Sequence, residues 1–121
     1  MIEHVTIPVR SYERAKAFYK AALAPLGYKN NMEFSPDAAG FMESGHTSFW
    51  IAVEETVEPT HVAFRAETRK AVEDFYKVAL EAGGKDNGAP GLRSDYSPDY
   101  YAAFVFDPDG NNIEAVTFST E

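Results

Sequence analysis

The chain of 121 residues contains no cysteine, which excludes disulfide bonds, thiolate metal sites and a cysteine nucleophile. Basic residues are also few, since 11 Lys and Arg stand against 19 Asp and Glu and give a formal net charge of -8. A chain with this charge repels the phosphates of nucleic acids, so we expect no nucleic-acid partner. No apolar run approaches the roughly 20 residues that span a bilayer, and we expect no membrane segment.

The beginning of the chain shows no secretory signal, because Met1 leads directly into the strand-like segment IEHVTIPV. We therefore expect a cytoplasmic location. The hydrophobic content of 45% is typical of a globular protein, and a chain of this length most simply forms one domain, residues 1–121.

An internal repeat divides this domain into two parts. Residues 4–27 and 61–84 align without gaps, and the identical pairs include His4 with His61. Each copy begins with alternating apolar residues, which predicts a strand, and continues with apolar residues at helical spacing. Two half-domains, residues 1–57 and 58–121, are therefore expected.

Each half is predicted to contain a strand, a helix and then two or three antiparallel strands, with the helix covering one face of the sheet. Ser11 and Thr68 are the predicted N-caps of the two helices. Later strands are indicated by FMES, TSFWIAVEE, AAFVFD and NNIEAVTF, the last two joined by the turn DPDG. The segment GGKDNGAPGLRSDYSPDYY is interpreted as a loop rich in Gly, Pro and Asp.

One carboxylate, Glu114, lies within the last predicted strand. The period of two places it on the face opposite Ile113 and Ala115, where Val116 and Phe118 make the wall partly apolar. An acid in such a place needs a partner. His4 and His61 also face away from the apolar sides of their strands, so two imidazoles and a carboxylate could bind Fe(II), Mn, Ni, Co or Zn and leave positions open for substrate. The alternative is that these are ordinary surface or hydrogen-bonded residues.

The segments EHVTIPV, AKAFYKAALAPLGY, THVAFRA and FVFDPDGNNIEAV resemble, in order, the motifs of the vicinal oxygen chelate superfamily, which contains glyoxalases, bleomycin-resistance proteins and extradiol dioxygenases. The resemblance implies an α+β fold of two paired βαβββ modules, whose mixed sheets form a curved cup with the helices on the outer face. It also implies a divalent metal ion bound by His4, His61 and Glu114. A homodimer is expected, with the cup closed either within one chain or between two chains.

One departure from the family pattern concerns the reaction. Glyoxalase I enzymes have a fourth ligand, a glutamate that also acts as a base, and Trp50 occupies its position here. The absence of this base argues against the glyoxalase I reaction on a glutathione hemithioacetal. We expect instead another metal-dependent reaction of the lyase or isomerase type within this superfamily, on a small oxygenated, anionic substrate that chelates the metal. An extradiol-type dioxygenase and a metal-free binding protein of the bleomycin-resistance type are the alternatives.

Other candidate site residues follow from their chemistry. The possible acid-base groups are His46 and Tyr101, each of which could instead have only a structural role. A substrate could contact a guanidinium, phenols and an indole, and the candidates for this contact are Arg93, Tyr96, Tyr100 and Trp50. The first three lie in the long Gly- and Pro-rich segment, which could form a lid over the cup.

Overall fold

The computed structural model describes all of residues 1–121, and each half of the chain has the order strand, helix and three strands. The first half comprises β1 (Val5–Val9), α1 (Tyr12–Ala22), β2 (Lys29–Phe34), β3 (Ala38–Glu43) and β4 (His46–Val53). The second comprises β5 (His61–Arg65), α2 (Arg69–Glu81), β6 (Lys85–Leu92), β7 (Tyr101–Phe106) and β8 (Asn112–Thr117). The predicted repeat of βαβββ modules is confirmed.

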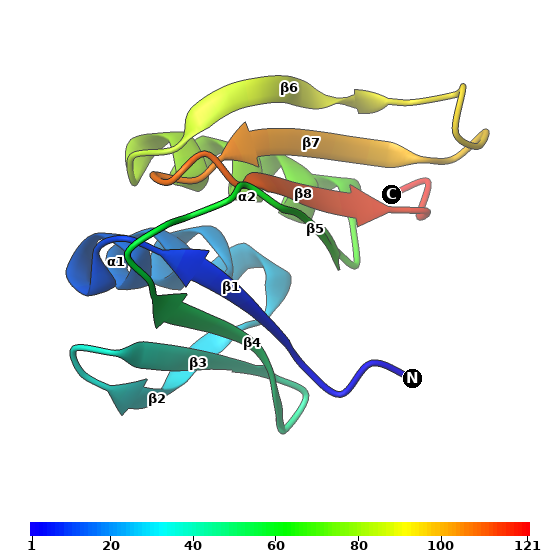
Figure 1. Ribbon diagram of the computed structural model, residues 1–121. Coiled ribbons are helices and arrows are strands. Elements are labelled where there is room, and N and C mark those ends of the chain that lie inside the picture. Colours follow the sequence, from blue (N-terminus) through cyan, green and yellow to red (C-terminus); the bar gives the residue numbers. More distant parts are fainter.

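Each module forms its own mixed sheet of four strands (Figure 1). The strand orders are β1-β4-β3-β2 and β5-β8-β7-β6. In each sheet the first strand pairs in parallel with the last, and the other neighbours are antiparallel. The strand that carries Glu114, β8, therefore lies in the interior of its sheet between β5 and β7.

Both helices begin at the predicted N-caps. The side chain of Ser11 accepts a hydrogen bond from the backbone N–H of Arg14, and that of Thr68 accepts one from Ala71. No helix has the length and apolar character that a membrane crossing requires.

The helix-facing sides of the two sheets share one hydrophobic core. The ring of Phe49 on β4 lies 5.0 Å from that of Phe64 on β5, and Tyr28 contacts Phe64 at 5.4 Å between centroids. The two helices also pack against each other. Because the helix-facing sides meet inside one chain, the opposite faces of the two sheets do not face each other.

The turn between β7 and β8 of the second module is hydrogen-bonded to the first module. Asp107 is buried and accepts hydrogen bonds from the backbone N–H groups of Asp109 and Asn111, from the Asn111 side chain at 2.9 Å, and from the hydroxyl of Tyr19 on α1. Gly110 has a φ of 89°, which a residue with a Cβ rarely adopts. The turn therefore fixes the start of β8 against the first module.

The structure corrects the interpretation of residues 83–101 as a loop, because residues 85–92 form β6. This edge strand pairs irregularly with β7 and contains Gly88, Pro90 and Gly91. Proline and glycine are tolerated at an edge, where fewer ladder hydrogen bonds are needed, but their presence obscures the strand in the sequence. Among the apolar residues of β4, Phe49 and Ile51 are buried while Val53, at the end of the strand, is 36% exposed.

Candidate metal centre

Glu114 is only 2% exposed although it lies on the face of β8 that the helices do not cover. Its strand neighbours Ile113 and Ala115 point into the core, as the period of two predicts. The cross-strand partners of Glu114 are Ala63 on β5 and Phe104 on β7. A carboxylate buried at this depth must be charge-paired or hydrogen-bonded, because an unpaired buried charge costs several kcal/mol.

His61 supplies one of these partners. Its Nε2 lies 2.9 Å from Oε1 of Glu114, and the imidazole is half-exposed. The parallel register of β5 and β8 produces this contact, since Ala63 lies opposite Glu114 and His61 is two residues earlier on the same face. An imidazole nitrogen and a carboxylate oxygen thus converge at the surface, and both are ligands that divalent transition metals accept.

His4, the third predicted ligand, lies elsewhere in the single chain. Its side chain is half-exposed, pairs with the neighbouring Glu3, and lines a cavity together with His46 and Trp50. No group of three or more His, Asp or Glu side chains converges in one chain as metal ligands do. One chain therefore holds two of the three predicted ligands on its second sheet, whereas His4 directly precedes β1 of the first sheet.

Tyr100 is the second partner of the Glu114 carboxylate. Its hydroxyl donates to Oε2 of Glu114, while its ring packs edge-on against Phe118 at 5.4 Å and Tyr96 at 5.0 Å. Burial, followed by the hydrogen bond to Glu114, raises the pKa of Tyr100 to about 12. The phenol therefore remains a hydrogen-bond donor at neutral pH.

Two arginines lie near this cluster without a carboxylate partner. The guanidinium of Arg93 lies 5.4 Å from the centroid of the Phe104 ring and donates to the carbonyl oxygen of Ala89. That of Arg65 lies 5.3 Å from the centroid of Phe118. Neither arginine takes part in an ion pair within the chain. Neither guanidinium is therefore neutralised by a carboxylate of the chain.

The open face of the first sheet is aromatic. Trp50 stacks on Phe34 with 6.0 Å between centroids and an angle of 19°, and Phe34 is 58% exposed. Gly40 makes room for the indole, because a Cβ at this position would lie 3.0 Å from the Trp50 ring. His46 lies at the edge of this face, and its Nε2 donates a hydrogen bond to the backbone carbonyl oxygen of Glu3 at 2.8 Å.

The remaining predicted site residues lie outside the Glu114 cluster or at its rim. Tyr101 is on the helix side of β7, where it packs against the core and donates to Glu73 of α2. Tyr96 is 65% exposed and contributes only its packing against Tyr100. The segment between β6 and β7 is closed by backbone hydrogen bonds such as Arg93 N–H to the Tyr100 carbonyl at 2.7 Å. It is a compact hairpin connection.

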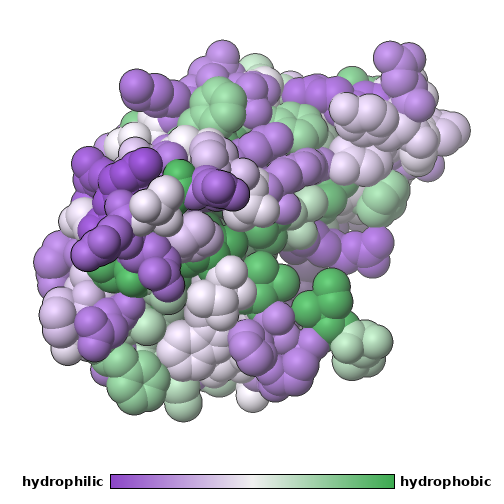
Figure 2. All heavy atoms as spheres, viewed as in Figure 1, coloured by the Kyte–Doolittle hydropathy of each residue, from purple (hydrophilic) through white to green (hydrophobic).

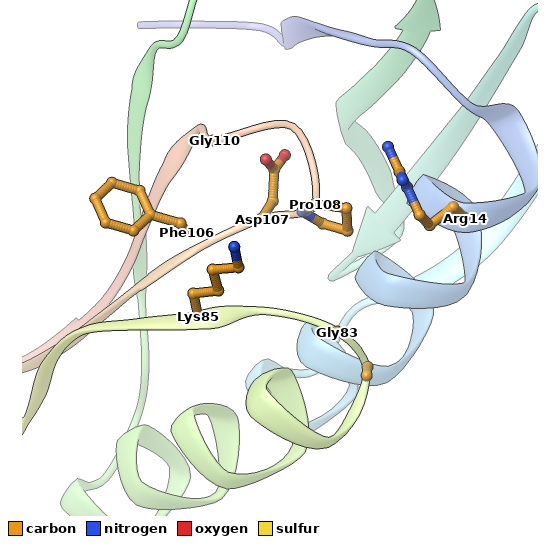
Figure 3. Close-up of a pocket in the computed structure, with 8 residues that line it drawn as sticks. Arg14, Gly83, Lys85, Phe106, Asp107, Pro108 and Gly110 are labelled. Atoms are coloured by element: carbon orange, nitrogen blue, oxygen red, sulfur yellow. The ribbon is translucent and has the colours of Figure 1, made fainter.

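The largest cavity, about 670 Å³, is separate from this cluster. It lies beside the turn between β7 and β8, with Lys85 and Asp107 on one side and Arg14 of α1 on the other (Figure 3). The oxygens of Asp107 are already occupied by hydrogen bonds, and no histidine lines the cavity. Its residues therefore offer no free metal ligand.

Sequence reasoning missed several residues of the two open faces. The place of Arg65 could have been predicted, because the period of two puts it on the same face of β5 as His61. Phe34 could not, because it belongs to β2, whose residues do not alternate between apolar and polar. The contact between Tyr100 and Glu114 had no signal in the sequence, since it depends on how the connection between β6 and β7 folds back over β8.

Comparisons with known proteins agree with this architecture. None of the curated proteins matches the chain. A glyoxalase/bleomycin resistance protein from Albidiferax ferrireducens has a similar structure, with a TM-score of 0.81, 27% identity and coverage of 95% of this chain and 96% of that one.

Two further structures are similar in fold. A glyoxalase/bleomycin resistance protein/dioxygenase family enzyme from Burkholderia phytofirmans has a TM-score of 0.74 at 21% identity, over 98% of this chain and 98% of that one. A lactoylglutathione lyase from Agrobacterium tumefaciens has a TM-score of 0.72 at 14% identity, over 97% of this chain and 92% of that one. Residues 1–115 match the family model of the Glyoxalase/Bleomycin resistance protein/Dioxygenase superfamily. The chain is a member of this superfamily.

Proposed function

We propose that this protein is a divalent-metal-dependent enzyme of the glyoxalase type whose metal is held by His61 and Glu114 of one copy and His4 of a second copy. The observation that carries the proposal is the contact of His61 Nε2 with Glu114 Oε1 at 2.9 Å. It places a buried carboxylate and a half-exposed imidazole at one point of an open sheet face. We take the third ligand to come from outside the chain, because catalytic sites of this kind have three protein ligands and no third candidate converges with His61 and Glu114 in one chain.

A second copy of the chain is proposed to supply that ligand. The open face of the first sheet carries His4 and the exposed side chains of Met32 and Phe34, while that of the second carries Phe118, which is 45% exposed. Apolar side chains gather beside the indentation between the two sheets (Figure 2). Exposed apolar surface of this kind is typical of faces that become covered by a partner. Pairing the first sheet of one copy with the second sheet of another would cover both faces.

The substrate is proposed to be a small, oxygenated anion. Arg93 and Arg65 both lack carboxylate partners and lie against aromatic rings close to the Glu114 cluster. A guanidinium in such a place binds a carboxylate or phosphate through paired hydrogen bonds. Trp50 would form an apolar wall on the opposite side of the cup, and His46 would be the candidate general acid or base.

The reaction proposed is a lyase or isomerase reaction in which a bound divalent ion supplies Lewis acidity to the substrate oxygens. The residues of the chain have separate tasks: His4, His61 and Glu114 hold the ion, and Arg93 orients the anionic group. Extradiol-type oxygenation is a second reaction that the same three-ligand set permits. A metal-free role in sequestering a ligand is the remaining alternative.

The experiment that tests the proposal is a measurement of metal content after reconstitution with Fe(II), Ni, Mn, Co and Zn. We expect near-stoichiometric metal in the parent protein and at least a tenfold loss of affinity in His61→Ala and in Glu114→Gln. His46→Ala is the matched control, because it removes a half-exposed imidazole outside the ligand set. Absence of metal in the parent protein under all conditions would overturn the enzyme proposal and favour ligand sequestration.

Arg93→Ala tests the substrate part separately. The variant should retain the metal but bind small oxygenated carboxylates at least tenfold more weakly, as measured by calorimetry on the metal-loaded protein. Equal affinities in variant and parent would show that Arg93 does not contact the substrate.

A further inference from the structure

The two oxygens of the Glu114 carboxylate have different partners in the structure. Oε1 lies beside Nε2 of His61, whereas Oε2 accepts a hydrogen bond from the hydroxyl of Tyr100. Glu114 is 2% exposed, and these two contacts are the hydrogen bonds that its buried carboxylate makes within the chain. One oxygen is therefore held by the protein, and the other lies next to the imidazole.

Tyr100 is itself held in place from three sides. Its backbone carbonyl accepts a hydrogen bond from Arg93 N–H at 2.7 Å, which closes the connection between β6 and β7. Its ring packs at nearly right angles against Phe118, at 89°, and against Tyr96, at 79°. A phenol fixed in this way has little rotational freedom to lose when it donates to a carboxylate.

We propose that Tyr100 is a positioning residue that holds Glu114 so that Oε1 alone, together with His61, is presented to the metal. The inference rests on the proposed metal site and assigns to Tyr100 a different task from the substrate contact expected from the sequence. Partners that orient a metal ligand commonly contribute tenfold to a hundredfold to metal affinity. The hydroxyl of Tyr100 is the only group besides His61 that contacts the Glu114 carboxylate through a hydrogen bond.

The neighbouring tyrosines provide a matched comparison. Tyr96 packs against Tyr100 but donates no hydrogen bond to Glu114, and Tyr101 donates to Glu73 on the other side of the sheet. Only Tyr100 therefore combines ring packing with a contact to the proposed ligand. A phenylalanine at this position would keep the packing against Phe118 and Tyr96 and would remove the hydroxyl alone.

The test is the affinity of the purified, full-length protein for Ni(II) and Co(II), measured by calorimetry for the parent, Tyr100→Phe and Tyr96→Phe. We expect Tyr100→Phe to bind both ions about 10- to 100-fold more weakly, and Tyr96→Phe to match the parent within about twofold. The visible absorption spectrum of the Co(II) form should also change in Tyr100→Phe, because the carboxylate can then rotate. If Tyr100 had only a structural role, a change in the spectrum would be accompanied by a lower thermal unfolding temperature. A changed spectrum at an unchanged unfolding temperature therefore indicates positioning of the carboxylate.

The outcomes separate this inference from the proposed function. If the parent binds metal and Tyr100→Phe has the same affinity and the same Co(II) spectrum, the positioning role is wrong while the metal site stands. If the parent binds neither ion, the metal site and the positioning role both fail. If Tyr96→Phe weakens binding as much as Tyr100→Phe, packing rather than the hydroxyl is responsible, and the inference is also wrong.

Discussion

Glu114 shows how strongly the surroundings of one residue determine its chemistry. The alternation of β8 predicts which face it occupies, but not that the face is closed over it by Tyr100 and His61. Burial of a carboxylate without such partners would cost several kcal/mol. The same reasoning applies to Asp107, whose buried carboxylate accepts a hydrogen bond from Tyr19.

Tyr19 leads to a prediction about alkaline stability. Burial, followed by the charge of Asp107, raises the pKa of Tyr19 well above 10. The folded protein therefore keeps this proton at a pH where the unfolded chain has lost it, so stability from this group is complete below about pH 10 and falls as the pH rises further. Per titrating group the decrease approaches about 1.4 kcal/mol per pH unit.

Tyr19→Phe should remove this part of the pH dependence. At neutral pH we expect the variant to be about 1–2 kcal/mol less stable, because Asp107 loses a hydrogen-bond donor. Between about pH 10 and 11.5 its unfolding free energy should fall less steeply than that of the parent, as measured by urea denaturation. Tyr96→Phe should retain the slope of the parent. An unchanged slope in Tyr19→Phe would mean that Tyr19 does not remain protonated in the folded state.

At the scale of elements, the turn between β7 and β8 determines where β8 begins. The sequence DPDG predicts a tight turn, and Gly110 has the expected positive φ, with its N–H donating to the Asp107 carbonyl at 3.0 Å. The link from this turn to the first module through Tyr19 is not visible in the sequence, because the two residues are 88 positions apart. Long-range side-chain contacts of this kind require the packed structure.

Asp107→Ala tests the importance of this link. The substitution leaves the Tyr19 hydroxyl, the Asn111 side chain and two backbone N–H groups without their acceptor, so we expect a loss of about 2–4 kcal/mol in the free energy of unfolding. Urea denaturation provides the measurement. Asp99→Ala, in an exposed part of the connection between β6 and β7, is the control and should change stability by less than about 0.5 kcal/mol. A loss in Asp107→Ala no greater than in the control would contradict the role assigned to the turn.

The strands themselves differ in how well the sequence predicts them. Those with alternating apolar residues, such as β1, β4 and β5, could be predicted because one face is buried in the core. The edge strands β2 and β6 could not, since Asn30, Asn31, Gly88 and Pro90 interrupt any alternation and little of these strands is buried. Edge strands are stabilised by pairing with a neighbour, which the sequence of one segment does not show.

At the scale of the whole molecule, the repeat predicts two modules but not how they combine. Closure of a cup within one chain and closure between two chains use the same ligands, so the sequence alone does not distinguish them. The contact of Phe49 with Phe64 brings the helix-facing sides of the sheets together inside one chain, which is why we propose closure between two chains. The faces that carry His4 and Glu114 are thereby separated, and the proposed metal site brings them together through a second copy.

The most direct test of this account is the metal content of a mixed dimer formed from His4→Ala and His61→Ala chains, co-expressed with two different tags and purified through both. Each variant alone should bind no metal, because every site lacks one ligand. In the mixed dimer, one site combines the intact His4 of one chain with the intact His61 and Glu114 of the other, so we expect about one metal ion per dimer by mass spectrometry. A mixed dimer that holds no more metal than either variant alone would contradict the account. An unsubstituted protein that binds metal as a monomer would also contradict it.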